Sequence, residues 1–120
     1  MLLTLLPDEL SVPCAEQAGP GVVIVVRPLD LEDKARWYTA CLAEGLDVGS
    51  PPASVRAVKL QLVRVEGVTV VYDAGTPAER RVAFDAADPQ HFRVLPMAAV
   101  LHAFGVMYDR STLTETQRGN

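Results

Sequence analysis

The chain has 120 residues, of which 49% are hydrophobic and 22% are charged. This length fits one domain, and the composition excludes a chain that is disordered throughout, because enough apolar surface is available to offset the ordering entropy. The net charge is -4 and neither half is net positive, so a nucleic-acid partner is not expected.

The N-terminal segment is apolar over residues 1–6, but it has no basic leader and Pro7 ends the apolar run. A signal peptide is therefore not expected, and residues 1–10 are predicted to be an extended segment packed on the core. Residues 21–26 are far fewer than the roughly 20 that a membrane-spanning helix needs, so no membrane partner is predicted. Glycines and prolines predict a loop over residues 11–21.

Residues 22–26 are predicted to form a central strand, because their β-branched side chains suit burial on both faces of a sheet. A helix is predicted over residues 31–44, with Asp30 as its N-cap and Gly45 at the C′ position. One face of this helix is apolar and is expected to pack on the sheet. That face comprises Leu31, Ala35, Tyr38, Cys41 and Leu42.

The segment 53–65 has features of both a helix and a strand. Ala53, Ala57 and Leu60 have helical spacing, whereas the valines of the same segment favour a strand. We predict a helix and keep the strand as the alternative. After Gly67, residues 68–85 alternate in the period of a strand on both sides of a turn, which predicts a β-hairpin.

The C-terminal part begins with a predicted helical turn at Asp88-Pro89, followed by a helix over residues 96–108. Residues 110–120 are polar and are predicted to be a solvated tail. The helix carries an apolar stripe formed by Met97, Val100, Leu101, Phe104 and Tyr108.

These elements predict an α+β fold in a single domain over residues 1–120. The expected fold is a small sheet that includes the hairpin, packed with two or three helices. The helices are those over residues 31–44, 53–65 and 96–108.

No catalytic, metal or cofactor site is predicted. Ser111 could supply a nucleophile and His91 or His102 a base, but none of these residues lies in a nucleophile elbow. We interpret both histidines as solvated helix-surface residues. Cys14 and Cys41 lack the close pairing of a zinc site and are interpreted as reduced structural cysteines, a disulfide between them being the alternative.

Other chemical candidates have simpler structural interpretations. Gly19-Pro20-Gly21 precedes a strand, whereas a phosphate-binding loop follows one. Two aspartate pairs, Asp30 with Asp33 and Asp85 with Asp88, could act as acid and base, but they lie where helix caps and turns favour aspartate. Trp37 is interpreted as covering the core beside Tyr38, and it becomes an interface candidate if it is exposed.

Residues 58–120 resemble a known family. The features are Leu62–Val68, a hairpin ending in Val82-Ala83-Phe84, an amphipathic helix, then 110–115 and the terminal Gly119-Asn120. Together they resemble the small tail assembly chaperones encoded between the major tail protein and the tape measure protein of long-tailed bacteriophages. Residues 25–29 resemble the family's opening strand more weakly. One departure is Val65, where relatives often carry an aromatic residue.

The resemblance implies that the chain binds the hydrophobic tape measure protein during tail assembly, keeps it soluble, and recruits tail-tube subunits in the cytoplasm of the infected bacterial host. It brings no catalytic residues. A homo-oligomer is a further expectation. The alternatives are a structural virion subunit of the tail tube or head–tail junction, and a small enzyme with an unrecognised site. The candidate interaction residues are Trp37, Met97, Leu101, Phe104, Tyr108 and Leu113.

Overall fold

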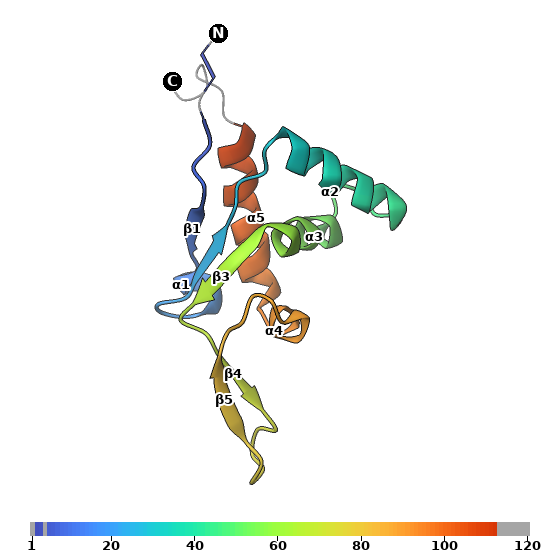
Figure 1. The fold of residues 1–120 in the computed structure, drawn as a ribbon. Coiled ribbons are helices and arrows are strands. Elements are labelled where there is room, and N and C mark those ends of the chain that lie inside the picture. Colours follow the sequence, from blue (N-terminus) through green and yellow to red (C-terminus); the bar gives the residue numbers. More distant parts are fainter. Residues whose placement is uncertain (1, 4, 113–120) are drawn as a thin grey trace.

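A computed structural model describes residues 2–3 and 5–112 and has an α+β fold, as predicted. In Figure 1 a small sheet lies beside the longer helices, and a second, two-stranded sheet projects from one end of the molecule. The strands are β1 (Leu10–Pro13), β2 (Val23–Val26), β3 (Leu62–Glu66), β4 (Thr69–Tyr72) and β5 (Arg80–Ala83). The helices are α1 (Ala15–Ala18), α2 (Leu31–Ala43), α3 (Pro51–Gln61), α4 (Pro89–Arg93) and α5 (Met97–Thr112).

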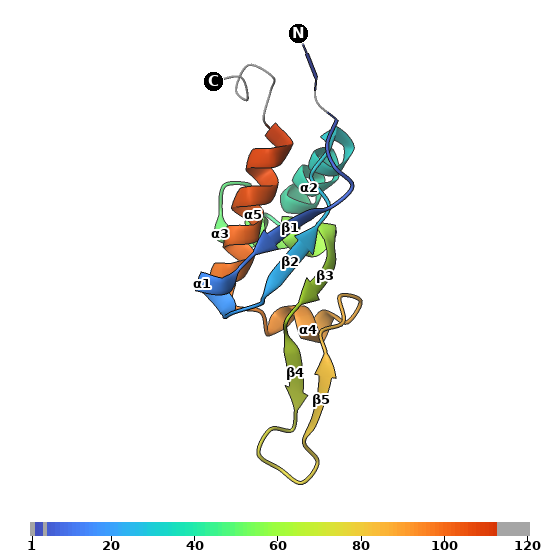
Figure 2. The ribbon, with the colours of Figure 1, turned by 90° about the vertical axis from the view of Figure 1, so that its left-hand side faces the viewer.

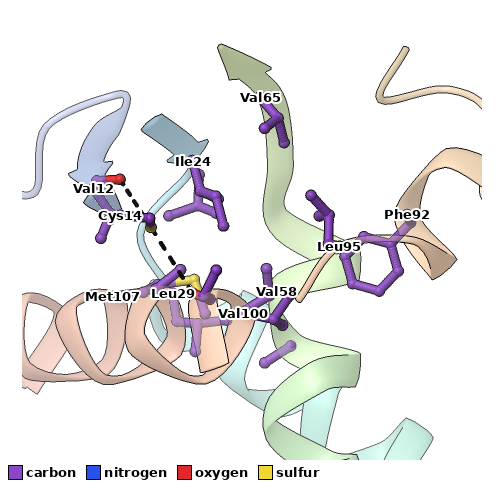
Figure 3. Close-up of a cluster of buried hydrophobic side chains, with 14 of the residues drawn as sticks. Val12, Cys14, Ile24, Leu29, Val58, Val65, Phe92, Leu95, Val100 and Met107 are labelled. Atoms are coloured by element: carbon purple, nitrogen blue, oxygen red, sulfur yellow. Dashed lines mark hydrogen bonds between the residues drawn. The ribbon is translucent and has the colours of Figure 1, made fainter. Parts of the chain in front are cut away.

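The first sheet is antiparallel with the order β1-β2-β3, so the valine-rich strand β2 is central, as predicted (Figure 2). Val12 of β1 and Val65 of β3 both lie opposite Ile24 of β2. These three side chains form one row across the sheet and face the helices, where they are buried among residues of α3 and α5 (Figure 3). This row anchors the hydrophobic core.

Strand β1 and helix α1 occupy the segment that the glycines and prolines predict to be a loop, so the loop prediction for residues 11–21 is wrong over most of its length. Pro13 is compatible with a strand here because β1 is an edge strand, where the missing N–H removes no ladder hydrogen bond. The expectation that residues 1–10 pack on the core is also wrong for Leu2, Leu3 and Leu5, which are exposed.

Helix α2 begins at the predicted residue and ends one residue before the prediction, at Ala43, with the predicted glycine at C′. The Asp30 side chain accepts a hydrogen bond of 2.8 Å from the Asp33 N–H. At the other end Gly45 has φ +69°, and the Leu46 N–H donates to the Cys41 carbonyl at 2.8 Å. This is the Schellman pattern that a C′ glycine permits.

The helix predicted over residues 53–65 is wrong in its last turn. Helix α3 ends at Gln61, and the chain continues directly into β3, where Val65 pairs with Ile24 and Arg64 pairs with Val25. The β-branched residues of this segment therefore complete the sheet instead of the helix.

The predicted hairpin is present: β4 and β5 pair antiparallel, with Val70 opposite Val82. The expectation that it belongs to the small sheet is wrong, because β4 and β5 form a sheet of their own after the chain turns at Gly67. Asp88 caps α4 by accepting a hydrogen bond from the Gln90 N–H at 2.9 Å, also as predicted. Helix α5 continues to Thr112, so residues 110–112 are helical and not part of a polar tail. The remainder of the predicted tail lies outside the described residues.

Helix α5 is rotated relative to the prediction. The buried face consists of Ala99, Val100, Ala103 and Met107, whereas Met97 is exposed. The two alanines let the helix backbone approach the sheet closely, so the smaller side chains face the core and the larger ones lie at its edge. Among the described residues, no helix combines the length and apolar character that crossing a bilayer requires.

Candidate protein-interaction site

Helix α2 has two apolar stripes on different faces. Trp37 and Cys41 form the buried stripe; Trp37 is 2% exposed, and its indole N–H donates to the Ala53 carbonyl of α3 at 2.8 Å. Because this bond and the large ring fix the helix on α3, Trp37 does not meet the exposure condition for an interface residue. The expectation that Trp37 covers the core is confirmed.

The other stripe of α2 faces solvent. It consists of Leu31, Ala35, Tyr38 and Leu42, at positions i, i+4, i+7 and i+11 of one helix face, and we call it the α2 stripe. Leu31 is 84% exposed, Leu42 is 77% exposed and Tyr38 is 40% exposed. The prediction that this face packs on the sheet is therefore wrong: only Cys41 of the predicted set is buried. Large apolar side chains gathered on one exposed face indicate a binding surface.

Aromatic rings brace α2 against α5. Phe104 lies 5.5 Å from Trp37 and 5.6 Å from Tyr108 between ring centroids, and Tyr38 stacks on Trp37 at 5.2 Å. Of the candidate interaction residues, Phe104 and Tyr108 are half-buried and pack against the core, and Leu101 is also half-buried. Another candidate, Leu113, lies outside the described residues.

A groove of about 360 Å³ lies on another part of the surface, between the C-terminal end of α2, α3, α4 and the start of α5. Met97, the last of the predicted interaction residues, lines it and is 59% exposed. Most of the lining is apolar and comprises Leu46, Pro52, Val55, Phe92, Leu95, Met97 and Val100.

The rim of this groove is mainly cationic, with Arg56, Lys59 and Arg93 against the single carboxylate of Glu44. Arg56 pairs with Glu44 at 2.9 Å, while its Nε is shielded from solvent and has no hydrogen-bond acceptor in the described part of the chain. With three cationic side chains against one carboxylate, the rim favours an acidic partner. Composition alone did not reveal this basic rim, because the chain as a whole is acidic.

His91 is not a solvated surface residue, contrary to the sequence interpretation: it is 3% exposed. The Asp85 N–H donates to Nδ1 at 2.9 Å, so in the neutral ring the proton lies on Nε2, which is 2.7 Å from the Tyr72 hydroxyl. The ring joins the base of the hairpin to α4. His102, in contrast, is exposed as predicted.

Cys14 and Cys41 are both free and buried, in agreement with the interpretation as reduced structural residues. Burial raises the pKa of both thiols, and for Cys41 the nearby Glu44 carboxylate raises the pKa further. The Cys14 thiol donates to the Val12 carbonyl at 3.3 Å (Figure 3). A raised pKa keeps each sulfur protonated, which is the opposite of what a nucleophilic cysteine requires.

A second hollow of about 400 Å³ lies beside α2, and Gln61 forms part of its wall. The Gln61 side-chain amide donates to the Pro28 carbonyl and to the Asp33 carboxylate, both at 3.1 Å. These bonds give Gln61 a structural role, because they hold the end of α3 against the chain that enters α2. Within the described chain, no three His, Cys, Asp or Glu side chains gather as a possible metal site.

Three comparisons with known proteins were negative: no family model, curated protein or solved structure matches this chain. The interaction site is therefore argued from the geometry of the described residues. One signal in the sequence points to the α2 stripe, namely that α2 has apolar residues on two faces although a surface helix needs only one.

Proposed function

We propose that this chain is a non-catalytic tail assembly chaperone of a long-tailed phage, which binds an apolar helical segment of the tape measure protein on the α2 stripe. The observation that supports binding is the exposure of Leu31 and Leu42 on one helix face. Each leucine gives roughly 1.5–3 kcal/mol when it is fully buried, so covering both supplies a large part of a binding free energy.

The spacing of the α2 stripe suits a helical partner. Its four side chains span three turns in a straight row, and an amphipathic helix presents apolar residues at the same intervals. Glu32, Arg36 and Thr39 are exposed beside this row and form a polar edge. Such an edge gives orientation and specificity while the apolar row gives affinity.

The identity of the partner rests on the family resemblance of residues 58–120. A tape measure protein is a long, hydrophobic, helical client in that family, and the α2 stripe is a surface of the matching chemistry. The negative charge of the chain would help to keep a complex with such a client soluble.

Co-expression with the neighbouring tape measure protein tests the proposal. The wild-type chain should raise the soluble yield of the tape measure, and a Leu31→Asp/Leu42→Asp variant should abolish this effect, because two buried aspartates replace two buried leucines. Binding should weaken on the order of a hundredfold or more.

Leu60→Asp is the matched control, since Leu60 is an exposed leucine of α3 that lies outside the α2 stripe. It should act like the wild type. An equal soluble yield with and without the chain, at equal expression, would contradict the proposal.

The second candidate function is a structural virion subunit, which would remain in the assembled virion. It is favoured by the exposed leucines of the N-terminal segment and the projecting hairpin, which neighbouring subunits could order or cover. Mass spectrometry of purified virions separates the two: a subunit is present in stoichiometric amounts and a chaperone is absent.

A further inference from the structure

The N-terminal arm, residues 2–3 and 5–8, carries apolar side chains that the body of the molecule leaves uncovered. Leu2, Leu3 and Leu5 are between 67% and 94% exposed. The arm ends with Asp8, so an apolar stretch is followed by a carboxylate. Exposing an extended apolar segment of this kind to water is unfavourable, and covering it with another surface would lower the free energy.

The groove between α3, α4 and α5 has the complementary chemistry. Its apolar lining, which includes Val55, Leu95 and Met97, matches the leucines, and the cationic Lys59 and Arg93 on its rim match the carboxylate at the end of the arm. The surface is distinct from the α2 stripe, so its use does not depend on client binding.

The arm of the same copy does not point toward this groove. Figure 1 shows the N-terminal segment leaving the body at the end opposite the hairpin, whereas α4, which contributes Phe92 and Arg93 to the groove, lies next to the hairpin. The two complementary surfaces of one molecule therefore lie toward opposite ends.

We propose that the N-terminal arm of one copy lies in the groove of a second copy. The leucines cover the apolar lining, and Asp8 lies at the cationic rim formed by Arg56, Lys59 and Arg93. Because two different surfaces meet, the contact is heterologous, and a pair of copies still has one free arm and one free groove. Association is head-to-tail and grows with concentration, into chains or a closed ring.

Sedimentation velocity of the full chain over a range of concentrations tests this arrangement. The wild type should associate. An arm variant, Leu3→Asp/Leu5→Asp, and a groove variant, Lys59→Glu/Arg93→Glu, should each associate at least about tenfold more weakly. The altered side chains are all exposed, so both variants should keep the wild-type circular dichroism spectrum.

Mixing the two variants gives the sharpest result. The arm variant retains an intact groove and the groove variant retains an intact arm, so the mixture should form a complex of one copy of each and nothing larger. Val71→Asp, on the exposed face of the hairpin, is the matched control and should associate like the wild type.

Three results would overturn the proposal: a wild type that stays monomeric at the highest concentration, an arm variant that associates as strongly as the wild type, or a mixture without a mixed complex. Leu31→Asp/Leu42→Asp separates the two proposals. This variant should lose the tape measure but keep self-association, whereas the arm variant should lose self-association but keep the tape measure.

Discussion

His91 has a structural role that its sequence context does not reveal. Two hydrogen bonds and the ring contacts with Tyr72 and Phe84 make it the link between the hairpin and α4. A histidine two residues after a proline in a short helix looks solvated from the sequence. It is buried here because Tyr72 of β4, 19 residues earlier in the chain, and the segment that follows β5 both pack against its ring.

Substitution of His91 should therefore loosen the hairpin. His91→Ala removes both bonds and leaves the Asp85 N–H without its acceptor, which should lower the free energy of unfolding by about 2–4 kcal/mol. Urea denaturation measures the loss. His102→Ala is the control and should change the free energy by less than about 0.5 kcal/mol, because the side chain is exposed. Equal effects of the two substitutions would contradict this role.

The buried thiols predict a loss of stability at alkaline pH. Burial raises the pKa of Cys14 and Cys41 above the ordinary 9.0, so above pH 9 the unfolded chain releases protons that the folded chain retains. The free energy of unfolding should fall as pH rises past 9, by up to about 1.4 kcal/mol per pH unit for each thiol. A Cys14→Ala/Cys41→Ala variant should have a shallower slope, and parallel profiles would be inconsistent with buried protonated thiols.

At the scale of elements, the joint between the two sheets depends on Gly67. It has φ +77°, and a Cβ at this position would lie 2.2 Å from the Gly21 carbonyl oxygen. The glycine thus serves two purposes: it turns the chain from β3 toward β4, and it lets the loop before β2 approach closely.

Gly67→Ala and Gly75→Ala form a matched pair, because both glycines have φ +77° but only Gly67 has a close neighbour. Both substitutions should cost about 1–2 kcal/mol for the left-handed backbone. Gly67→Ala should cost at least ~2 kcal/mol more because of the steric clash. Thermal or urea unfolding measures the difference, and equal losses would show that the approach of Gly21 is not tight.

The sequence predicts which elements exist better than which face each one buries. The cap at Asp30, the glycine at Gly45 and the hairpin follow from local rules and are confirmed. Which face of α2 is buried does not follow from local rules, because the helix has two apolar stripes. The buried one is fixed by packing that includes the hydrogen bond from Trp37 to α3. The position at which α3 ends also depends on contacts distant in sequence, since β3 forms only because β2 offers a partner strand.

The functional site could be predicted only in part for the same reason. The sequence predicts Met97 as an interaction residue, and it lines the groove, but the cationic residues of the groove rim come from α3 and α4 and converge only in the folded chain. The α2 stripe was visible in the sequence, yet amphipathic spacing indicates the core as readily as a partner.

At the scale of the whole molecule, three unlike surfaces are arranged around one core. The α2 stripe offers a straight apolar row, the groove offers an apolar floor with a basic rim, and the arm offers leucines followed by a carboxylate. We propose that the first binds the client while the other two join copies of the chain. A client that is longer than one copy could then be covered by several.

Hydrogen exchange of the chain with and without the tape measure protein is the most direct test of client binding by the α2 stripe. Binding should slow exchange over residues 31–43 and leave the hairpin, residues 69–83, unchanged. The Leu31→Asp/Leu42→Asp variant should show no slowing. Slowing confined to the hairpin or to α5, or no change with the wild type, would contradict the assignment of client binding to α2.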